Sequence, residues 1–445
     1  MSEQAARQPP NEYQRFLQTL PMDWDRKEIR QLGTVVGGGT PSRDVPSFWQ
    51  GGIPWVTPGE VSGNATKFLY ATNEHISATG LAGSGANVLP TGSLMVTTRA
   101  TLGARVINAV PMATNQGFKS IVFKQIADSG FYLYLFEKVQ PELVRRASGT
   151  TFLEISGAEF ASIEVPSPPL DEKHLIIDIL DTLTTTIHET EAIIAKLKAV
   201  KQGLLHDLLT RGIDANGELR SPQAEAPHLY KKSPLGWIPK DWDSKQLREI
   251  VAEDSPITYG VVQPGVEVED GVPFIRGGDV FGGRILVEQL RTISHRVSNS
   301  YRRTQLRGGE LLMSLVGYPG EVGIAPVALA GANIARQAAL IRPADSGRTS
   351  YVMHYLSSAD GKRQILGQSL GSAQQVVNLN DVRTVEIPQP PLDEAAEVAH
   401  RVGAVSDRLD QEFAELGKRR ALKSGLMDDL LTGRVRVTPL LEGAA

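Results

Sequence analysis

The sequence predicts a mixed α/β fold in which two globular domains, related by internal duplication, are joined by two long antiparallel helices that form a coiled coil. Three observations predict it: an internal repeat, two long segments with heptad spacing, and short apolar runs separated by glycine and proline. We expect the segments 1–168 (first globular domain), 169–212 (central helix), 213–390 (linker and second globular domain) and 391–445 (C-terminal helix).

The duplication is visible as six pairs of motifs that recur in the same order. The paired motifs stand between 217 residues (His75 and Thr292) and 222 residues (Pro168 and Pro390) apart. A single duplication with small loop changes explains this narrow range better than chance. Three of the pairs are Leu20–Asp25 with Ile238–Asp243, Pro168–Glu172 with Pro390–Glu394, and Gly203–Thr210 with Gly425–Thr432.

The first part of each repeat, roughly 20–168 and 238–390, is rich in glycine, proline and short apolar runs. Such runs between turn residues are typical of short strands. We expect strands at 93–96, 120–123, 310–315 and 338–341, and helices at 131–147 and 351–367.

The second part of each repeat is predicted to be one long helix. Between Asp171 and Thr210 apolar residues alternate at spacings of four and three, with interruptions at Thr190 and Lys201, and the same pattern recurs 222 residues later. This is a heptad seam, so the two helices are expected to bury each other; a place in a four-helix bundle or a face for a partner is the alternative. Forty helical residues span about 60 Å. The apolar positions are Ile176, Leu180, Leu183, Ile187, Ile194, Leu197, Leu204 and Leu208, then Val398, Val402, Val405, Leu409, Leu416, Leu426 and Leu430.

The ends of both helices carry recognisable signals. Proline-rich entries at 166–169 and 388–391 set the starts, and Gly212 and Gly433 stand where C-caps are expected. The carboxylate pairs at 171–172 and 393–394 are interpreted as favourable charges at the positive end of the helix dipole. Trp24 and Trp242 recur in the repeat, which favours a packing role for both.

Composition narrows the class of protein. The 445 residues include no cysteine, which excludes disulfides, thiolate zinc sites and a cysteine nucleophile. The polar start lacks the apolar core of a secretion signal, and no run reaches the ~20 apolar residues of a membrane helix. We therefore expect a cytoplasmic protein.

Charge is distributed unevenly although the net value is only −4. Basic residues dominate 61–127 and 283–308, at similar places in the two repeats. Either cluster alone fits ordinary solvated arginines, whereas two matching clusters indicate an anionic partner such as DNA. A duplicated domain on a rigid helical spacer further suggests two sequence elements separated by a fixed gap.

Motifs for chemistry are missing from the sequence. It contains no tetrapeptide of the Asn-Pro-Pro-Tyr type for a flipped adenine and no phosphate loop ending in Gly-Lys-Ser/Thr. Gly37–Gly39 follows an apolar run but lacks a lysine, so a simple turn is the favoured interpretation. We expect no catalytic residue and no metal site.

The chain resembles the specificity subunit of Type I restriction–modification systems, over nearly its whole length. The resemblance is carried by Pro21–Asp25, the segment Gly149–Ile155 before Pro168–Glu172, the central Ser233–Trp242 and the closing Ser424–Arg434. It implies two target recognition domains that each read a few base pairs of a bipartite, asymmetric DNA site, and an antiparallel coiled coil that sets the gap. It also implies two methylation subunits and motor-nuclease subunits as partners, with S-adenosylmethionine, ATP and Mg bound by those partners and no cofactor in this chain.

Base readout favours Arg or Lys for guanine and Asn or Gln for adenine. Asn115-Gln116 and Arg336-Gln337 occupy comparable places before two predicted strands, although such residues often only satisfy a turn. The candidate DNA-binding residues are Arg99, Arg105, Asn115, Gln116 and Lys119 in the first domain, and Arg302, Arg303, Tyr318, Arg336, Gln337 and Gln374 in the second.

Two other functions remain open at this stage. A coiled-coil assembly scaffold would show no salt-dependent affinity for DNA, in contrast to a specificity subunit. A self-contained modification enzyme would methylate adenine with S-adenosylmethionine alone, and the missing motifs argue against it.

Overall fold

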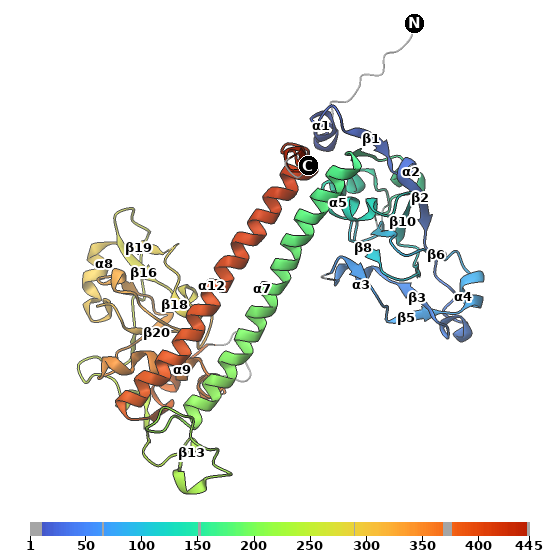
Figure 1. The fold of residues 1–445 in the computed structure, drawn as a ribbon. Helices are drawn as coiled ribbons and strands as arrows, with labels where there is room; N and C mark the ends of the chain where they lie inside the picture. The colour runs from blue at the N-terminus through green and yellow to red at the C-terminus, as the bar shows by residue number, and fades with distance from the viewer. Residues whose placement is uncertain (1–10, 65, 150–152, 289, 368–375, 443–445) are drawn as a thin grey trace. The chain divides into compact units, whose positions relative to one another are not determined.

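The chain folds into two compact units that each combine segments of both repeats. The computed structural model describes residues 11–64, 66–149, 153–288, 290–367 and 376–442. Unit 1 comprises Met1–Glu189 with Leu416–Ala445, and unit 2 comprises Thr190–Glu415. Each unit therefore holds one globular domain, the start of one long helix and the end of the other (Figure 1). The predicted domain boundaries follow the chain, whereas these units divide the helices, so the boundaries stay a prediction.

The globular domain of unit 1 is built on two mixed sheets. Their strand orders are β2-β10-β7-β8-β4 and β5-β3-β9-β6, and β1 pairs with β11 separately. The β4–β8 and β3–β9 pairs are parallel, and the other pairs in these sheets are antiparallel. The strands are β1 (Asp25–Glu28), β2 (Gly33–Gly37), β3 (Ile53–Val56), β4 (Phe68–Leu69), β5 (Glu74–Ile76), β6 (Val88–Leu89), β7 (Leu94–Thr97), β8 (Arg105–Asn108), β9 (Met112–Thr114), β10 (Phe118–Phe123) and β11 (Glu164–Ser167).

Unit 2 repeats this arrangement. Its sheets have the orders β15-β23-β20-β21-β18-β17 and β19-β16-β22, with the separate pairs β14–β24 and β12–β13. The parallel pairs are again the corresponding ones, β18–β21 and β16–β22. The strands are β12 (Tyr230–Ser233), β13 (Gly236–Pro239), β14 (Asp243–Gln246), β15 (Thr258–Tyr259), β16 (Val272–Ile275), β17 (Val280–Phe281), β18 (Gly283–Ile285), β19 (Arg291–Ile293), β20 (Leu311–Ser314), β21 (Val322–Ile324), β22 (Asn333–Ile334), β23 (Ala338–Ile341) and β24 (Glu386–Gln389). The predicted duplication is confirmed at the level of topology.

Short helices connect the strands. They are α1 (Glu12–Gln18), α2 (Ile29–Leu32), α3 (Pro58–Ser62), α4 (Ala78–Ala82), α5 (Asp128–Arg146), α6 (Gly157–Ala161), α8 (His295–Ser300), α9 (Thr349–Ser357), α10 (Ala359–Leu366), α11 (Leu379–Arg383) and α13 (Thr438–Glu442). The helix predicted at 131–147 is α5. The one predicted at 351–367 is two helices, because Ser358 has extended backbone and its hydroxyl accepts a hydrogen bond from the Gly361 amide (3.2 Å), which starts α10.

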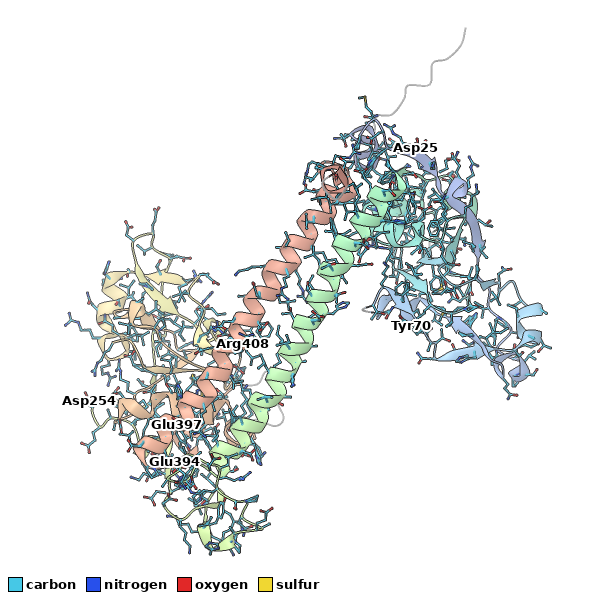
Figure 2. All side chains as sticks on the ribbon, viewed as in Figure 1. Asp25, Tyr70, Asp254, Glu394, Glu397 and Arg408 are labelled. Carbon is cyan, nitrogen blue, oxygen red and sulfur yellow. The ribbon has the colours of Figure 1, made fainter. Side chains whose placement is uncertain are left out.

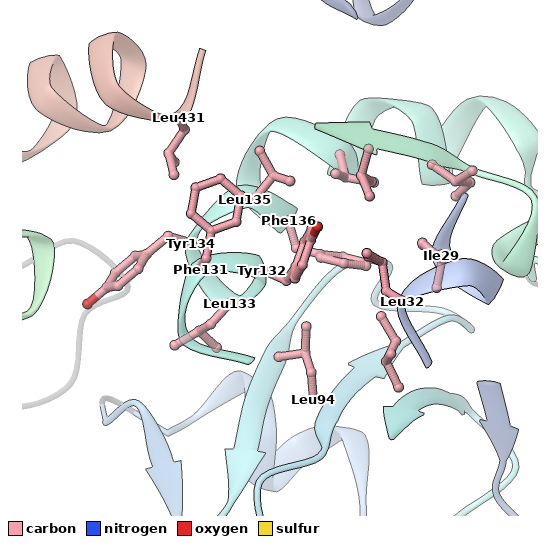
Figure 3. Close-up of a cluster of buried hydrophobic side chains, with 14 of the residues drawn as sticks. Ile29, Leu32, Leu94, Phe131, Tyr132, Leu133, Tyr134, Leu135, Phe136 and Leu431 are labelled. Carbon is pink, nitrogen blue, oxygen red and sulfur yellow. The ribbon is translucent and has the colours of Figure 1, made fainter. Parts of the chain in front are cut away.

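The core of unit 1 is centred on α5. Its residues 131–136 are all buried, and they lie among β7, α2 and the end of α12, as Leu94, Ile29 and Leu431 show (Figure 3). A helix buried on nearly all sides cannot show a clean amphipathic pattern. At its first turn Asp128 forms a buried ion pair with Lys173 (2.7 Å), which ties α5 to the start of the long helix.

The two long helices are α7 (Leu170–Thr210) and α12 (Leu392–Leu431), of 41 and 40 residues. The start of α7 lies in the same unit as the end of α12, and the reverse holds in the other unit, so the helices are antiparallel. The predicted seam is buried at Ile176, Leu180 and Leu416 in unit 1 and at Ile194, Leu208, Val398, Val402 and Leu409 in unit 2. The predicted antiparallel pair of helices is confirmed, and Gly212 and Gly433 both have positive φ (62° and 69°), as expected of C-caps.

In unit 1, a buried carboxylate joins three segments that are distant in the sequence. Glu172, on the first turn of α7 and 1% exposed, accepts a hydrogen bond from the indole Nε1 of Trp24 (2.7 Å). Arg436, beyond the end of α12, donates to both of its oxygens (2.9 Å each) and to Asp23 (2.9 and 2.7 Å). The hydrogen bond from Arg436 lowers the pKa of Asp23. We call this set of four residues the unit 1 clamp.

Unit 2 contains the corresponding clamp. Glu394, on the first turn of α12 (Figure 2), accepts hydrogen bonds from the indole of Trp242 (3.0 Å) and the backbone amide of Ile213 (2.8 Å). Arg220, beyond the end of α7, donates to Glu394 (3.0 Å) and to Asp241 (2.8 Å). In both units the arginine follows the other repeat's long helix, so each clamp closes one repeat against the other.

The clamps correct the interpretation of the helix-start carboxylates. A charge that only favours the helix dipole stays exposed to solvent, but Glu172 and Glu394 are 1% and 8% exposed. Burial of a carboxylate is tolerated when it is paired and hydrogen-bonded, as both are here. The two tryptophans pack as expected, and their indole N–H groups also supply part of that bonding.

We expect Arg220→Ala to lower the free energy of unfolding by about 3–5 kcal/mol, because it leaves Glu394 charged and buried without its partner. Urea unfolding of the full chain measures the change. Adding Glu394→Gln to the same variant is expected to restore part of the loss. Arg363→Ala is the control, because that exposed arginine pairs with Asp360 in its own helix and is expected to change stability by less than about 0.5 kcal/mol. Equal effects of the two alanine variants would contradict the clamp.

A buried histidine gives unit 2 a second testable property. His354 on α9 is 5% exposed, and its pKa falls from the ordinary 6.5 to about 4, chiefly through burial and also through Lys201. The unfolded chain therefore takes up this proton at higher pH than the folded chain does.

Stability is accordingly expected to fall as pH drops from about 6.5 to about 4, by up to about 3 kcal/mol from this residue. Unfolding of the wild type and His354→Gln across this range measures the effect. The variant should show a shallower loss of stability on acidification. Parallel pH profiles for the two proteins would show that His354 is not the group responsible.

Candidate nucleic-acid interface

The candidates of unit 1 centre on the turn between β9 and β10. Its backbone is held from two sides: the Asn115 amide donates to the Val56 carbonyl (3.1 Å), and the Thr98 amide donates to the Gly117 carbonyl (2.7 Å). The Asn115 side chain accepts from the Gly117 amide (2.9 Å), so it stabilises the turn itself. Gln116, between them, is exposed. We call residues 115–117 the unit 1 turn.

The unit 2 turn, residues 335–337, is built with the same bonds. The Ala335 amide donates to the Ile275 carbonyl (2.8 Å), and the Leu315 amide donates to the Gln337 carbonyl (2.8 Å). Arg336 in the middle is exposed, and its backbone amide donates to the Val261 carbonyl (2.9 Å). The strand register, Phe118 opposite Thr97 and Ala338 opposite Ser314, agrees with these bonds.

This register shifts the expected correspondence by one residue. Gln116 corresponds to Arg336, and Gly117 corresponds to Gln337, whereas the sequence had suggested that the two dipeptides match as pairs. Ala335 takes the place of Asn115, so the amide that stabilises the first turn has no counterpart in the second. The strand pairing decides which residues correspond, and it could not be predicted from the sequence, because both dipeptides precede an apolar run at nearly the same distance.

A second loop lies against each turn. In unit 1 it runs from Thr98 to Gly103, and Ala100 has φ +60°, a conformation that costs a non-glycine residue about 1–2 kcal/mol. The Ala100 amide donates to the Leu153 carbonyl (3.2 Å), which helps to hold it there. In unit 2 the equivalent position is Gly317, with φ +108°.

Two basic side chains of unit 1 share one carboxylate. Arg99 and Lys119 each approach Glu154, with N–O distances of 3.7 Å, and Arg99 also pairs with Glu154 through a β-bridge. Glu154 and Arg99 are each 41% exposed, so the pairing is weak and open to competition by another anion. Glu154 was not predicted from the sequence, because it lies far from both partners along the chain.

Arg105 lies apart from this group. Its guanidinium donates to the Gly103 carbonyl (3.2 Å) and to the Leu133 carbonyl, and it pairs with Glu137 (3.5 Å). Burial lowers its pKa, although Glu137 opposes the shift. The side chain thus joins β8 to α5, away from the Arg99 side chain.

Unit 2 places an aromatic pair beside its turn. The rings of Tyr318 and Phe281 lie 5.0 Å apart, and both residues are about half exposed (49% and 48%). Tyr318 belongs to the loop 315–320 that is bonded to the Gln337 carbonyl. Phe281 was missed in the sequence, where only its position before Gly282-Gly283 marks it as a turn residue.

The other arginines of unit 2 lie elsewhere. Arg302 and Arg303 are exposed, and the Arg303 carbonyl accepts a hydrogen bond from Arg342 (3.3 Å), which follows β23. Arg336 precedes β23, so the two groups are associated with opposite ends of this strand. Gln374 lies outside the described residues.

Other kinds of site have no counterpart in the described part of the chain. Among those residues, no group of three or more His, Asp or Glu side chains could hold a metal ion. In the same ranges no helix is long and apolar enough to cross a membrane.

Comparison with known proteins shows which proteins this chain is similar to. Residues 21–199 match the family model described as the Type I restriction modification DNA specificity domain. The chain is similar to Type I specificity subunits. It is 24% identical, over 95% of both chains, to the Type I restriction enzyme MjaIX specificity subunit of Methanocaldococcus jannaschii. It is 27% identical to the EcoBI specificity subunit of Escherichia coli, over 65% of this chain and 61% of the relative.

Solved structures agree on the fold. The S subunit of a Type I restriction–modification system from M. genitalium superposes with a TM-score of 0.57 at 14% identity, covering 93% of this chain and 98% of that one. A chain from a study of complex assembly in a Type I system has a TM-score of 0.52 at 17% identity. The predicted fold class and family resemblance are confirmed. The relatives are named as specificity subunits, which supports the expectation of a non-catalytic component.

Proposed function

We propose that this specificity subunit reads a bipartite, asymmetric DNA site with its two globular domains. The observation that carries the proposal is the construction of the same exposed turn in both units, with Gln116 at the centre of one and Arg336 at the centre of the other. Amide and guanidinium groups are the side chains that best recognise adenine and guanine in the major groove. Different side chains on equivalent backbones would give the site two unlike halves.

The surrounding residues suit contacts with the DNA backbone. Arg99, Lys119, Arg302 and Arg303 are basic side chains of the kind that contact phosphates, which position a protein on the duplex without reading sequence. Tyr318 and Phe281 offer an exposed aromatic surface beside the second turn. We assign Arg105 to support of the domain, since its guanidinium is already bonded within it.

The chemistry belongs to partner subunits in this proposal. Two methylation subunits would use S-adenosylmethionine and be placed over adenines in the site, and motor-nuclease subunits would use ATP and Mg. The helix pair would set the gap between the two half-sites. The resemblance to Type I specificity subunits supports this division of labour.

The proposal predicts that adenine methylation in a methylation-free host will follow one two-part motif with a fixed gap. The host expresses this chain with the methylation subunit encoded beside it, and whole-genome sequencing of modified bases gives the motif. A control strain lacks this chain and is expected to show no motif. If both proteins assemble but no motif appears, the chain is a scaffold and the proposal is wrong.

A matched pair of arginines tests the placement of the surface. Arg99→Ala is expected to weaken binding of the assembled complex to its DNA site at least about fivefold, with unchanged thermal stability of the subunit. Arg105→Ala is expected to lower thermal stability and leave the methylated motif unchanged, because its bonds are internal. Fluorescence titration, calorimetry and motif sequencing measure these properties. The opposite pattern in the two variants would contradict the placement.

A further inference from the structure

We infer that Gln116 and Arg336 are equivalent specificity residues, which read the same position of their respective half-sites as adenine and as guanine. This inference rests on the proposed function and adds to it which residue reads and which base it selects. The sequence alone does not align these two positions. Matching the dipeptide Asn115-Gln116 with the dipeptide Arg336-Gln337 would align Gln116 with Gln337 instead.

The backbone equivalence of the two positions is supported by close packing on the far side of each turn. A Cβ atom on Gly38 would lie 2.5 Å from the Thr114 carbonyl oxygen, and one on Gly260 would lie 1.8 Å from the corresponding Ile334 carbonyl oxygen. Only glycine permits this approach. Both turns are therefore fixed by the same strand-end glycine, and their central side chains leave from the same place in the domain.

The central position is the one that has an exposed polar side chain in both turns. Asn115 uses its amide oxygen on the Gly117 amide, and its counterpart Ala335 has no polar group. Gln337 is half-buried, and its counterpart is Gly117. Exposure and polar chemistry coincide in both units only at Gln116 and Arg336.

The surroundings of Gln116 suit adenine. The Thr40 hydroxyl donates to the Gln116 Oε1 atom, which holds the end of this side chain beside the turn. An amide oxygen accepts two hydrogen bonds, so Oε1 still has room for the adenine N6 amino group, and Nε2 can donate to N7. The contact with Thr40 thus restrains the Gln116 side chain before DNA binds.

The surroundings of Arg336 suit guanine. Its guanidinium has no side-chain partner in the part of the chain that the structure describes, and it carries only donors, which match the O6 and N7 acceptors of guanine. Counting from Gly260 as from Gly38, the position of Thr40 is taken by Val262, which has no hydroxyl. Unit 2 therefore lacks the group that restrains an amide, as expected where the reading residue is an arginine.

Exchange of the two residues tests the inference. Gln116→Arg, Arg336→Gln and the double variant are each expressed with the methylation subunit, and the methylated motif is determined for each. Gln116→Arg is expected to change one position of the first half-site from adenine to guanine, and Arg336→Gln to make the reverse change in the second. The preference at that position should shift by roughly 5- to 150-fold in binding competition between the two DNA sites.

Matched controls separate readout from charge. Gln125→Arg adds the same charge just beyond the other end of β10, and Arg363→Gln removes an exposed charge on α10. Both controls are expected to keep the wild-type motif. Gln116→Ala and Arg336→Ala are small exposed changes, and each should relax one position to any base.

The outcomes also distinguish the inference from the proposed function. A wild-type motif that survives unchanged in the exchange and alanine variants would overturn the inference and leave the proposed function intact. Uniform weakening at all positions would also overturn it, because that is the behaviour of a phosphate contact. Absence of any motif with the wild-type chain would overturn the proposed function and the inference together.

Discussion

The buried carboxylate at the start of each long helix is the interaction on which the rest of the structure depends. Glu172 and Glu394 each join a tryptophan from the beginning of their own repeat to an arginine that follows the other repeat's helix. A buried carboxylate without such partners is costly, so the three segments are stable only when assembled together. This explains why each compact unit draws on both repeats and why neither repeat forms a unit by itself. The constraint is electrostatic and local, but it fixes where each globular domain meets its helix.

In the two globular domains, the backbone of the turn is the same and the side chain at its centre differs. The turns around Gln116 and Arg336 share their backbone hydrogen bonds and the close approach of a glycine, and these bonds do not involve the central side chain. A side chain that points outward from such a turn can be replaced at little cost to the fold, since exposed substitutions usually change stability by less than about 0.5 kcal/mol. Specificity and stability are therefore assigned to different atoms of the same turn.

The sequence was sufficient for features that depend on periodicity and repetition. The helix pair, the duplication, several strands and the two C-cap glycines follow from spacing alone, because those patterns are local. Contacts between distant segments could not be predicted from the sequence. Glu172 was interpreted from its place at a helix start, and only the fold brings Arg436 close to it. Likewise, the strand register that aligns Gln116 with Arg336 depends on pairing across the sheet. For the same reason the internal bonding of Arg105 could not be predicted, because the groups that it contacts lie on α5.

Site-specific photocrosslinking tests the central claim most directly. A p-benzoylphenylalanine residue placed at 116 or at 336 reports on the DNA within a few ångströms of each turn in the assembled complex. We expect the probe at 116 to label bases of one half-site only and the probe at 336 to label bases of the other half-site only, at equivalent positions in each. Labelling of the same half-site by both probes, or labelling of partner protein with no DNA product, would contradict it.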